Sequence, residues 1–504
     1  MSVVVLDFGS QYTQLIVRRL RELHVLSVVL PATADVDRIL KEAPQAVVLS
    51  GSPHSATATD APRPDDRLYD LGLPMLGICY GFHLLVERFG GHVIPTTRRE
   101  YGRAELSTTA GALFEDLPAG AHVWMSHADS VESLPGGWRV TSSSSENPIV
   151  AAESADGRLV GVQFHPEVSH TPIGPAVLER FLDRAAVARD WTPEGMLDRI
   201  SRETIEQVDG ERVLLAVSGG VDSSTLALLL ARCGIEHLGV FVDHGLLRSG
   251  ERETVAASLR DVGVNLQVVD AQERFFAALR GIVDPEEKRR AIGREFVAVF
   301  EEVAQREGPF RLLAQGTLYP DVIESAGSES AANIKSHHNV GGLPEILQFD
   351  LVEPFRLLFK DEVRVVARGL GLPSDIRDRH PFPGPGLAIR VLGEVTPERV
   401  ELAREADRIF VEGLRESGWY DRVWQALAIL IPVRTVGVAG DERRYGDVVA
   451  LRAVTSVDGM TADWARLPDE LVDEISRRMT REVPEIGRVV YDVSSKPPAT
   501  IEWE

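Results

Sequence analysis

Residues 213–224 read VLLAVSGGVDSS, and this stretch decides which kind of fold the chain can adopt. The first five residues form an apolar run that predicts a short buried strand. A glycine-rich turn follows, and a helical pattern begins at Ser223. Such a turn exposes backbone N–H groups at the positive end of a helix, where an anion can bind. The stretch therefore predicts an α/β fold with an anion site at the end of a strand.

The local pattern leaves a simpler interpretation open. No lysine occupies the place that the Gly-x-x-x-x-Gly-Lys-Ser/Thr loop requires. Asp222 and Ser223 are also good helix caps, so an ordinary strand-to-helix turn explains the same residues.

Strand and helix patterns alternate in both directions from this stretch. Apolar runs that predict strands lie at 3–6, 47–49, 74–78, 150–152, 159–164, 238–242, 266–269 and 312–314. We expect two doubly wound, mostly parallel sheets, followed by a smaller α+β domain. The expected domains are residues 1–187, 188–379 and 380–504. A helical run at 185–188 precedes the expected linker, and the serine-rich residues 141–145 are expected to form a loop.

Composition narrows the class of protein. The 504 residues carry 54 Lys and Arg against 76 Asp and Glu, a net charge of −22. This net charge argues against a general nucleic-acid or anionic-membrane binder, because both need a basic face. Two cysteines exclude a disulfide framework, and no run approaches the roughly 20 apolar residues of a membrane span. We expect a cytoplasmic protein that binds neither nucleic acid nor membrane.

A second motif, GICYG at 77–81, places Cys79 where a predicted strand meets a helix. This geometry is typical of a nucleophile elbow, in which the helix N-terminus favours the thiolate. His165 and Glu167 follow another predicted strand, and alternate residues of an extended chain face the same side. The three residues predict a catalytic triad. A buried structural cysteine and a surface His-Pro-Glu turn are the alternatives.

With SGSP at 50–53, MSH at 125–127 and FHPEV at 164–168, this part of the chain resembles the class I glutamine amidotransferases. The resemblance implies that glutamine is hydrolysed through a thioester on Cys79. It also implies an oxyanion site built from the backbone N–H groups of Gly51 and Tyr80. The family usually has glycine at the positions of Ser52 and Ala128.

The complete SGGVDSS motif resembles the pyrophosphate loop of the N-type ATP pyrophosphatases, which transfer AMP from ATP to a substrate oxygen. The resemblance implies Mg²⁺ as a cofactor with ATP, and Asp222 is its candidate ligand. Lys360 is a candidate to neutralise charge on the leaving pyrophosphate, although it also fits an exposed helix start. The residues implied to hold the pyrophosphate are Ser218, Gly219, Gly220, Val221, Asp222, Ser223 and Ser224.

Three further segments resemble the glutamine-hydrolysing GMP synthases: SHHNVGGLP at 336–344, HPFPGPGLAIR at 380–390 and KPPATIEWE at 496–504. That family makes GMP, AMP, pyrophosphate and glutamate from XMP, ATP, glutamine and water. The resemblance implies adenylation of the XMP C2 oxygen, displacement of AMP by ammonia, and a homodimer. Candidate XMP contacts are Arg289, Pro385, Gly386, Gln425, Asp441, Lys496 and Glu502.

Some alternatives remain at this stage. Arg289 lies in a charge run that also fits a solvated helix face. From the residues themselves, a dimer is supported by the apolar run 427–431 and by a C-terminal α+β block with little catalytic chemistry of its own. Another glutamine-dependent ATP pyrophosphatase, acting on a carboxylate or a tRNA base, is the second candidate. A regulatory protein with an inactive amidotransferase domain is the third, although all three triad residue types are present.

Overall fold

The computed structural model describes residues 2–118, 120–326, 349–439, 442–456, 459 and 461–504. The chain divides into two compact units, Met1–Met196 and Leu197–Glu504. The three-domain division expected from the sequence stays a prediction.

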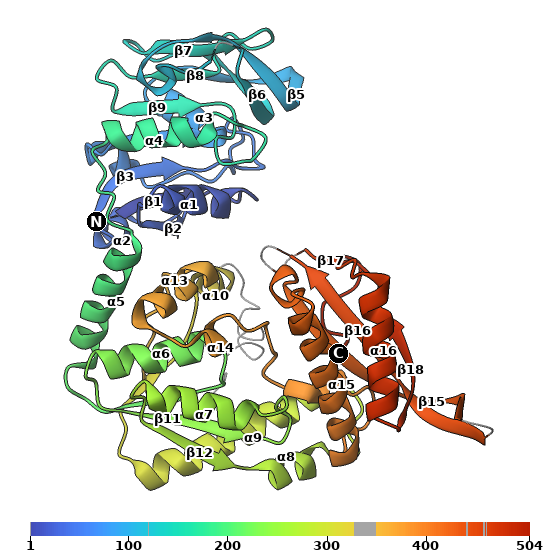
Figure 1. Cartoon of the computed structure of the whole chain (residues 1–504). Helices are drawn as coiled ribbons and strands as arrows, with labels where there is room; N and C mark the ends of the chain where they lie inside the picture. The colour runs from blue at the N-terminus through green and yellow to red at the C-terminus, as the bar shows by residue number, and fades with distance from the viewer. Residues whose placement is uncertain (1, 119, 327–348, 440–441, 457–458, 460) are drawn as a thin grey trace. The chain divides into compact units, whose positions relative to one another are not determined.

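The first unit is built on a nine-stranded sheet with the strand order β2-β1-β3-β4-β9-β8-β7-β5-β6 (Figure 1). The five strands from β2 to β9 pair in parallel, and the remaining pairings are antiparallel. The strands are β1 (Ser2–Asp7), β2 (Ser27–Pro31), β3 (Pro44–Leu49), β4 (Met75–Ile78), β5 (His92–Thr109), β6 (His122–Ser133), β7 (Arg139–Ser144), β8 (Ala151–Glu153) and β9 (Leu159–Val162). Its helices are α1 (Thr13–Glu22), α2 (Val36–Lys41), α3 (Tyr80–Arg88) and α4 (Gly174–Arg184).

Two expectations for this unit are wrong. Residues 141–144 are not a loop, because they belong to strand β7, where Thr141 and Ser142 are buried; Ser145 alone of the expected loop lies outside the strand. Antiparallel pairing with β5 and β8 outweighs the weak strand propensity of serine. The helical run expected at 185–188 is absent, because α4 ends at Arg184 and Ala186 takes a positive φ of 50°.

Helix α5 (Pro193–Val208) leads into the five-stranded parallel sheet of the second unit, ordered β12-β11-β10-β13-β14. The strands are β10 (Val213–Ala216), β11 (His237–Asp243), β12 (Leu266–Asp270), β13 (Leu312–Ala314) and β14 (Asp350–Val352). The helices are α6 (Val221–Arg232), α7 (Glu251–Asp261), α8 (Gln272–Leu279), α9 (Pro285–Glu307), α10 (Tyr319–Ala326), α13 (Lys360–Leu370) and α14 (Ser374–Arg377).

The C-terminal part of this unit is a four-stranded mixed sheet, on which two helices pack (Figure 1). Its elements are β15 (Gln425–Ala439), β16 (Glu442–Thr455), β17 (Asp463–Trp464), β18 (Ile486–Tyr491), α15 (Pro397–Glu416) and α16 (Asp469–Glu482). One hydrophobic cluster runs from Leu214 in β10 to Leu430 in β15 and Val449 in β16. The mixed α/β architecture with a smaller C-terminal part confirms the predicted fold class. Within the described residues, no helix is long and apolar enough to cross a membrane.

Candidate active sites

Cys79 lies at the sharp turn between β4 and α3. Its φ of 53° and ψ of −104° lie outside the regions that side chains favour. A Cβ atom on Gly77 would lie 2.5 Å from the Gly81 carbonyl oxygen, and one on Gly81 would lie 2.2 Å from that of Leu49. These close approaches explain why the turn needs glycine on both sides of the cysteine.

The imidazole of His165 is held by Glu167. Both side chains are buried, and His165 Nδ1 lies 2.6 Å from Glu167 Oε1. Burial lowers the pKa of His165, but the charge of Glu167 and the hydrogen bond to Cys79 outweigh it and raise the pKa to about 10. The structure therefore brings the three predicted triad residues together, in an arrangement that supports nucleophilic attack by the thiol.

The two predicted oxyanion residues lie beside this group. A Cβ atom on Gly51 would be only 3.2 Å from His165 Cε1. Tyr80 is the first residue of α3, so its N–H has no acceptor within the helix. The Ser50 carbonyl accepts from Gly81 N at 3.1 Å and ties the two loops together.

The SGGVDSS loop joins β10 to α6. Gly219 takes a φ of +76°, which side chains rarely adopt, and Gly220 is the N-cap of α6. The hydroxyls of Ser218 and Ser223 lie 3.0 Å apart, and Ser223 Oγ accepts from Ser218 N at 3.1 Å. The loop therefore surrounds the N-terminus of α6, where the helix dipole favours an anion.

Lys360 is brought to this loop from far along the chain. It is the first residue of α13, and its ammonium forms an ion pair with Asp222 Oδ2. Asp222 Oδ1 and Ser224 Oγ are buried and have no hydrogen-bond partner among the described residues. These two oxygens remain available to a ligand that carries a cation or a donor. Among the described residues, no group of three or more His, Cys, Asp or Glu side chains could hold a metal ion by itself.

A third group of predicted residues meets at the C-terminus of the chain. Arg390 is fully buried and donates to Glu502 through Nη2 at 2.9 Å and Nε at 3.2 Å. Gln425 Nε2 donates to the same carboxylate at 2.7 Å, and Arg289 Nη2 donates to the Glu504 carbonyl oxygen at 2.5 Å. Gln425 thus contacts Glu502, and Arg289 contacts Glu504 of the same tail.

The remaining predicted contacts are more dispersed. Lys496 Nζ donates to the Gly459 carbonyl at 2.8 Å. Gly386 follows Pro385, and its φ is +61°. A Cβ atom there would lie 2.4 Å from the Leu246 carbonyl oxygen, so only glycine fits beside the loop after β11. Asp441 and the segment 336–344 lie outside the described residues.

Reasoning from sequence missed several residues of these sites. Arg390 belongs to the motif HPFPGPGLAIR, but its carboxylate partners Asp407 and Glu502 lie 17 and 112 positions away in the chain. Gln163 and His83, which lie beside Cys79, gave no separate signal. The motifs GICYG and SGGVDSS mark the positions of two sites in the sequence. They do not predict that Gln163 pairs with His83 or that Arg390 pairs with two carboxylates.

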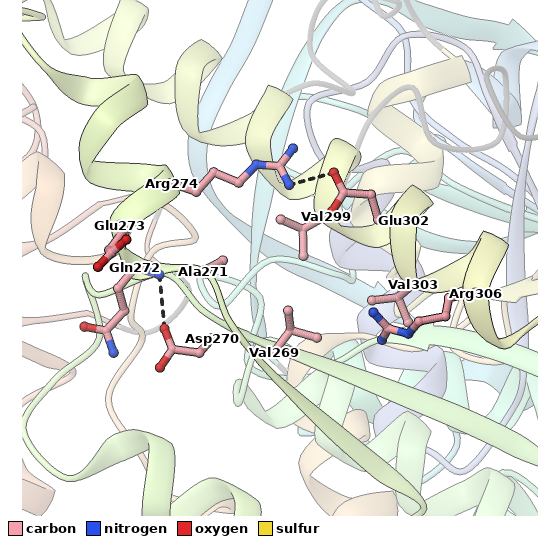
Figure 2. A pocket seen from close by; sticks show the side chains of 10 residues that line it. All are labelled: Val269, Asp270, Ala271, Gln272, Glu273, Arg274, Val299, Glu302, Val303 and Arg306. Atoms are coloured by element: carbon pink, nitrogen blue, oxygen red, sulfur yellow. Dashed lines mark hydrogen bonds and ion pairs between the residues drawn. The ribbon is translucent and has the colours of Figure 1, made fainter.

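The second unit also has an open cavity of about 700 Å³ between the end of β12, the start of α8 and α9 (Figure 2). None of the site residues predicted from the sequence lines it. Arg274 points across it to Glu302, with 2.7 Å between Nη1 and Oε1, and it also pairs with Glu295. The charge of Arg274 is thus paired with carboxylates of the protein itself.

Comparison with known proteins gives matches along the chain. Residues 4–185 match the model of the class-I glutamine amidotransferase family, residues 195–307 match the PP-loop domain, and residues 412–503 match the GMP synthase C terminal domain. A GMP synthase [glutamine-hydrolyzing] of Thermus thermophilus is 65% identical over 502 residues, covering 100% of both chains. Relatives of the same name from Thermomicrobium roseum and Aquifex aeolicus are 52% and 50% identical, each over 100% of this chain and 96% and 99% of their own.

The fold and the sites thus define an amidotransferase joined to a PP-loop ATP-binding unit. With relatives of this identity over its whole length, the chain belongs to the family of glutamine-hydrolysing GMP synthases.

Proposed function

We propose that this protein is a ligase that makes GMP from XMP, with glutamine as the nitrogen donor and ATP as the energy source. The observation that carries the proposal is the presence, on one chain, of a Cys-His-Glu arrangement and a phosphate loop completed by Lys360. Full-length similarity to GMP synthases supports the same reaction.

In the first unit, we assign the nucleophile to Cys79. Its thiolate attacks the glutamine side-chain amide, and His165 carries the proton between the sulfur and the leaving ammonia. Glu167 keeps the imidazole oriented. The N–H groups of Gly51 and Tyr80 stabilise the oxyanion, and water then releases glutamate from the thioester.

In the second unit, we assign the triphosphate of ATP to the loop 218–224 at the N-terminus of α6. The XMP C2 oxygen attacks the α-phosphate, pyrophosphate leaves, and ammonia then displaces AMP from C2. Lys360 neutralises charge on the leaving pyrophosphate. Mg²⁺ bound with ATP would add to this neutralisation, and the unpartnered Asp222 Oδ1 is the oxygen that fits it.

For XMP, we assign contacts to Arg289, Pro385, Gly386, Gln425, Lys496 and Glu502, and to Asp441 from the motif alone. A guanidinium and an ammonium suit the nucleotide phosphate, while a carboxylate and an amide suit the purine edge or the ribose. A shared ligand is supported by the hydrogen bond of Gln425 to Glu502 and by that of Arg289 to Glu504 of the same tail.

We further propose a cytoplasmic homodimer. The run 427–431 does not support the dimer, because Leu427, Ile429 and Leu430 are buried within their own chain. The support comes from the hairpin of β15 and β16, where Val433, Val436, Val438 and Tyr445 are exposed. Sedimentation velocity measures the mass, and a monomer at micromolar concentration would remove this part of the proposal.

The test of the reaction is analysis of purine products by chromatography. ATP, Mg²⁺ and XMP are supplied with either glutamine or ammonium. We expect GMP and AMP from both nitrogen sources. Glutamate without GMP, with ammonium also inactive, would mean that the amidotransferase serves another acceptor.

A further inference from the structure

Cys79 has a buried neighbour besides the residues of the triad. Gln163 follows β9 and is fully buried, and its Nε2 lies 3.8 Å from Cys79 Sγ. On another side of the sulfur, the Ser126 carbonyl oxygen lies 3.6 Å from Sγ and accepts from the thiol. A thiol whose hydrogen is given to one acceptor, like a thiolate, can only accept from a further partner. The amide of Gln163 must therefore turn its NH₂ group, not its oxygen, toward the sulfur.

His83 fixes the orientation of this amide through a hydrogen bond to its oxygen. His83 lies on α3, one turn after Cys79, and its Nε2 is 2.7 Å from Gln163 Oε1. Burial lowers the pKa of His83 to about 4, so the ring is neutral near pH 7. Because the amide oxygen can only accept, the proton of the neutral ring is on Nε2. His83 thus donates to the oxygen while the amide donates to the sulfur.

We propose that His83 and Gln163 form a hydrogen-bond relay that stabilises the Cys79 thiolate, with His83 as a positioning residue for the Gln163 amide. The inference rests on the proposed role of Cys79 as the nucleophile. An amide cannot give up its proton at ordinary pH, so Gln163 supports the negative sulfur without protonating it. The other ionisable groups around the relay are His165 and Glu167 after β9, and His127 and Asp129 on β6.

The experiment measures the rate at which iodoacetamide alkylates Cys79 in the full chain as a function of pH. A Cys233→Ser background removes the other cysteine, which lies at the end of α6. The variants are Gln163→Met, which keeps the length of the side chain without a donor, His83→Leu, and the double variant. Gln45→Met is the matched control, because Gln45 accepts from Ala188 N and does not touch the sulfur.

We expect Gln163→Met to move the midpoint of alkylation up by about one pH unit, which is about tenfold less thiolate below the midpoint. His83→Leu should move it in the same direction, and the double variant should match Gln163→Met, because His83 acts through Gln163. His83→Gln retains an N–H donor and should restore the midpoint. The turnover of glutamine should fall with the thiolate fraction, while ammonium-dependent synthesis stays unchanged.

Two results would overturn the relay. One is an unchanged pH midpoint of Cys79 alkylation in folded Gln163→Met and His83→Leu proteins, and the other is additive shifts of this midpoint in the double variant. If Gln163→Met fails to fold, the relay is tested by comparing His83→Leu with His83→Gln. Equal pH midpoints of Cys79 alkylation in these two variants would contradict the relay. Hydrolysis of glutamine by a Cys79→Ser protein would instead overturn the proposed nucleophile.

Discussion

The buried guanidinium of Arg390 binds the carboxylate of Glu502 with two hydrogen bonds, although the residues lie 112 positions apart. Arg390 Nη1 also donates to Asp407 Oδ1 at 3.1 Å, so one side chain links the C-terminal tail to helix α15. Fork-shaped pairs of this kind fix the orientation of a carboxylate as well as its position. Glu502 is thereby held beside Gln425 for its proposed contact with XMP.

Arg390→Lys should weaken XMP binding by about tenfold or more, because an ammonium cannot make the paired contacts of a guanidinium. The buried carboxylate of Asp407 and the partly buried carboxylate of Glu502 lose partners, so the free energy of unfolding should fall by about 3 kcal/mol. Calorimetric titration with XMP and urea unfolding measure the two effects. Arg434→Lys, at an exposed position of β15, is the control. Wild-type XMP affinity in Arg390→Lys would contradict the proposed role of this pair.

Cys79→Ala should abolish the use of glutamine and leave ammonium-dependent GMP synthesis intact. The reason is that the thiol belongs to the first unit, while the proposed ATP site belongs to the second. Initial rates with glutamine and with ammonium, at saturating ATP and XMP, measure both activities. Loss of both would argue against separable sites.

Asp222→Ala should stop ATP cleavage with either nitrogen source, with a loss of at least about 100-fold. The change removes the partner of Lys360 and the unpartnered oxygen that fits Mg²⁺. Pyrophosphate release is the measurement, and Asp361→Ala on the neighbouring helix is the matched control. A normal rate of release from Asp222→Ala would show that the phosphate-loop assignment is wrong.

Removal of residues 496–504 should impair XMP binding. The tail supplies Glu502, whose carboxylate pairs with Arg390, and Glu504, whose carboxylate pairs with the buried Lys288. XMP titration of the shortened chain is the measurement, and glutamine hydrolysis by the first unit is the internal control for correct folding there. An unchanged titration would exclude the tail from the XMP site.

Acid should destabilise the second unit through His244. Burial lowers the pKa of this ring to about 4 from an ordinary value near 6.5. Between these values the unfolded chain binds a proton that the folded protein does not. The neutral ring therefore makes its full contribution to the free energy of unfolding above pH 6.5. This contribution is lost as the pH falls toward 4, and the loss is about 2 kcal/mol at pH 5.

His244→Asn keeps an acceptor for Leu246 N and removes the titrating ring. The free energy of unfolding should consequently fall less between pH 7 and pH 5 in this variant than in the wild type. Urea titrations at both pH values provide the comparison, and His54→Asn is an exposed control. If the free energy of unfolding falls equally in the wild type and in His244→Asn, the acid sensitivity does not come from His244.

Local sequence determined the fold class, the family and the turns at the two proposed sites. The strands and helices that flank Cys79 and the loop 218–224 follow from apolar runs ended by glycine, because backbone strain at a tight turn is decided by neighbouring residues. The pairing of His165 with Glu167 does not follow from the alternation of an extended chain, because β9 ends at Val162 and a turn includes Pro166 and Glu167. The fold class and the family therefore follow from motifs that are each local.

Only the tertiary structure decided which distant charges meet. Lys360 reaches Asp222 because α13 packs against α6, and Arg390 reaches Glu502 because the tail folds back onto the unit. The burial of residues 141–142 depends on strands that pair with them from both sides. Such pairings arise from the packing of whole elements, and charge or propensity at one position carries no information about its partner.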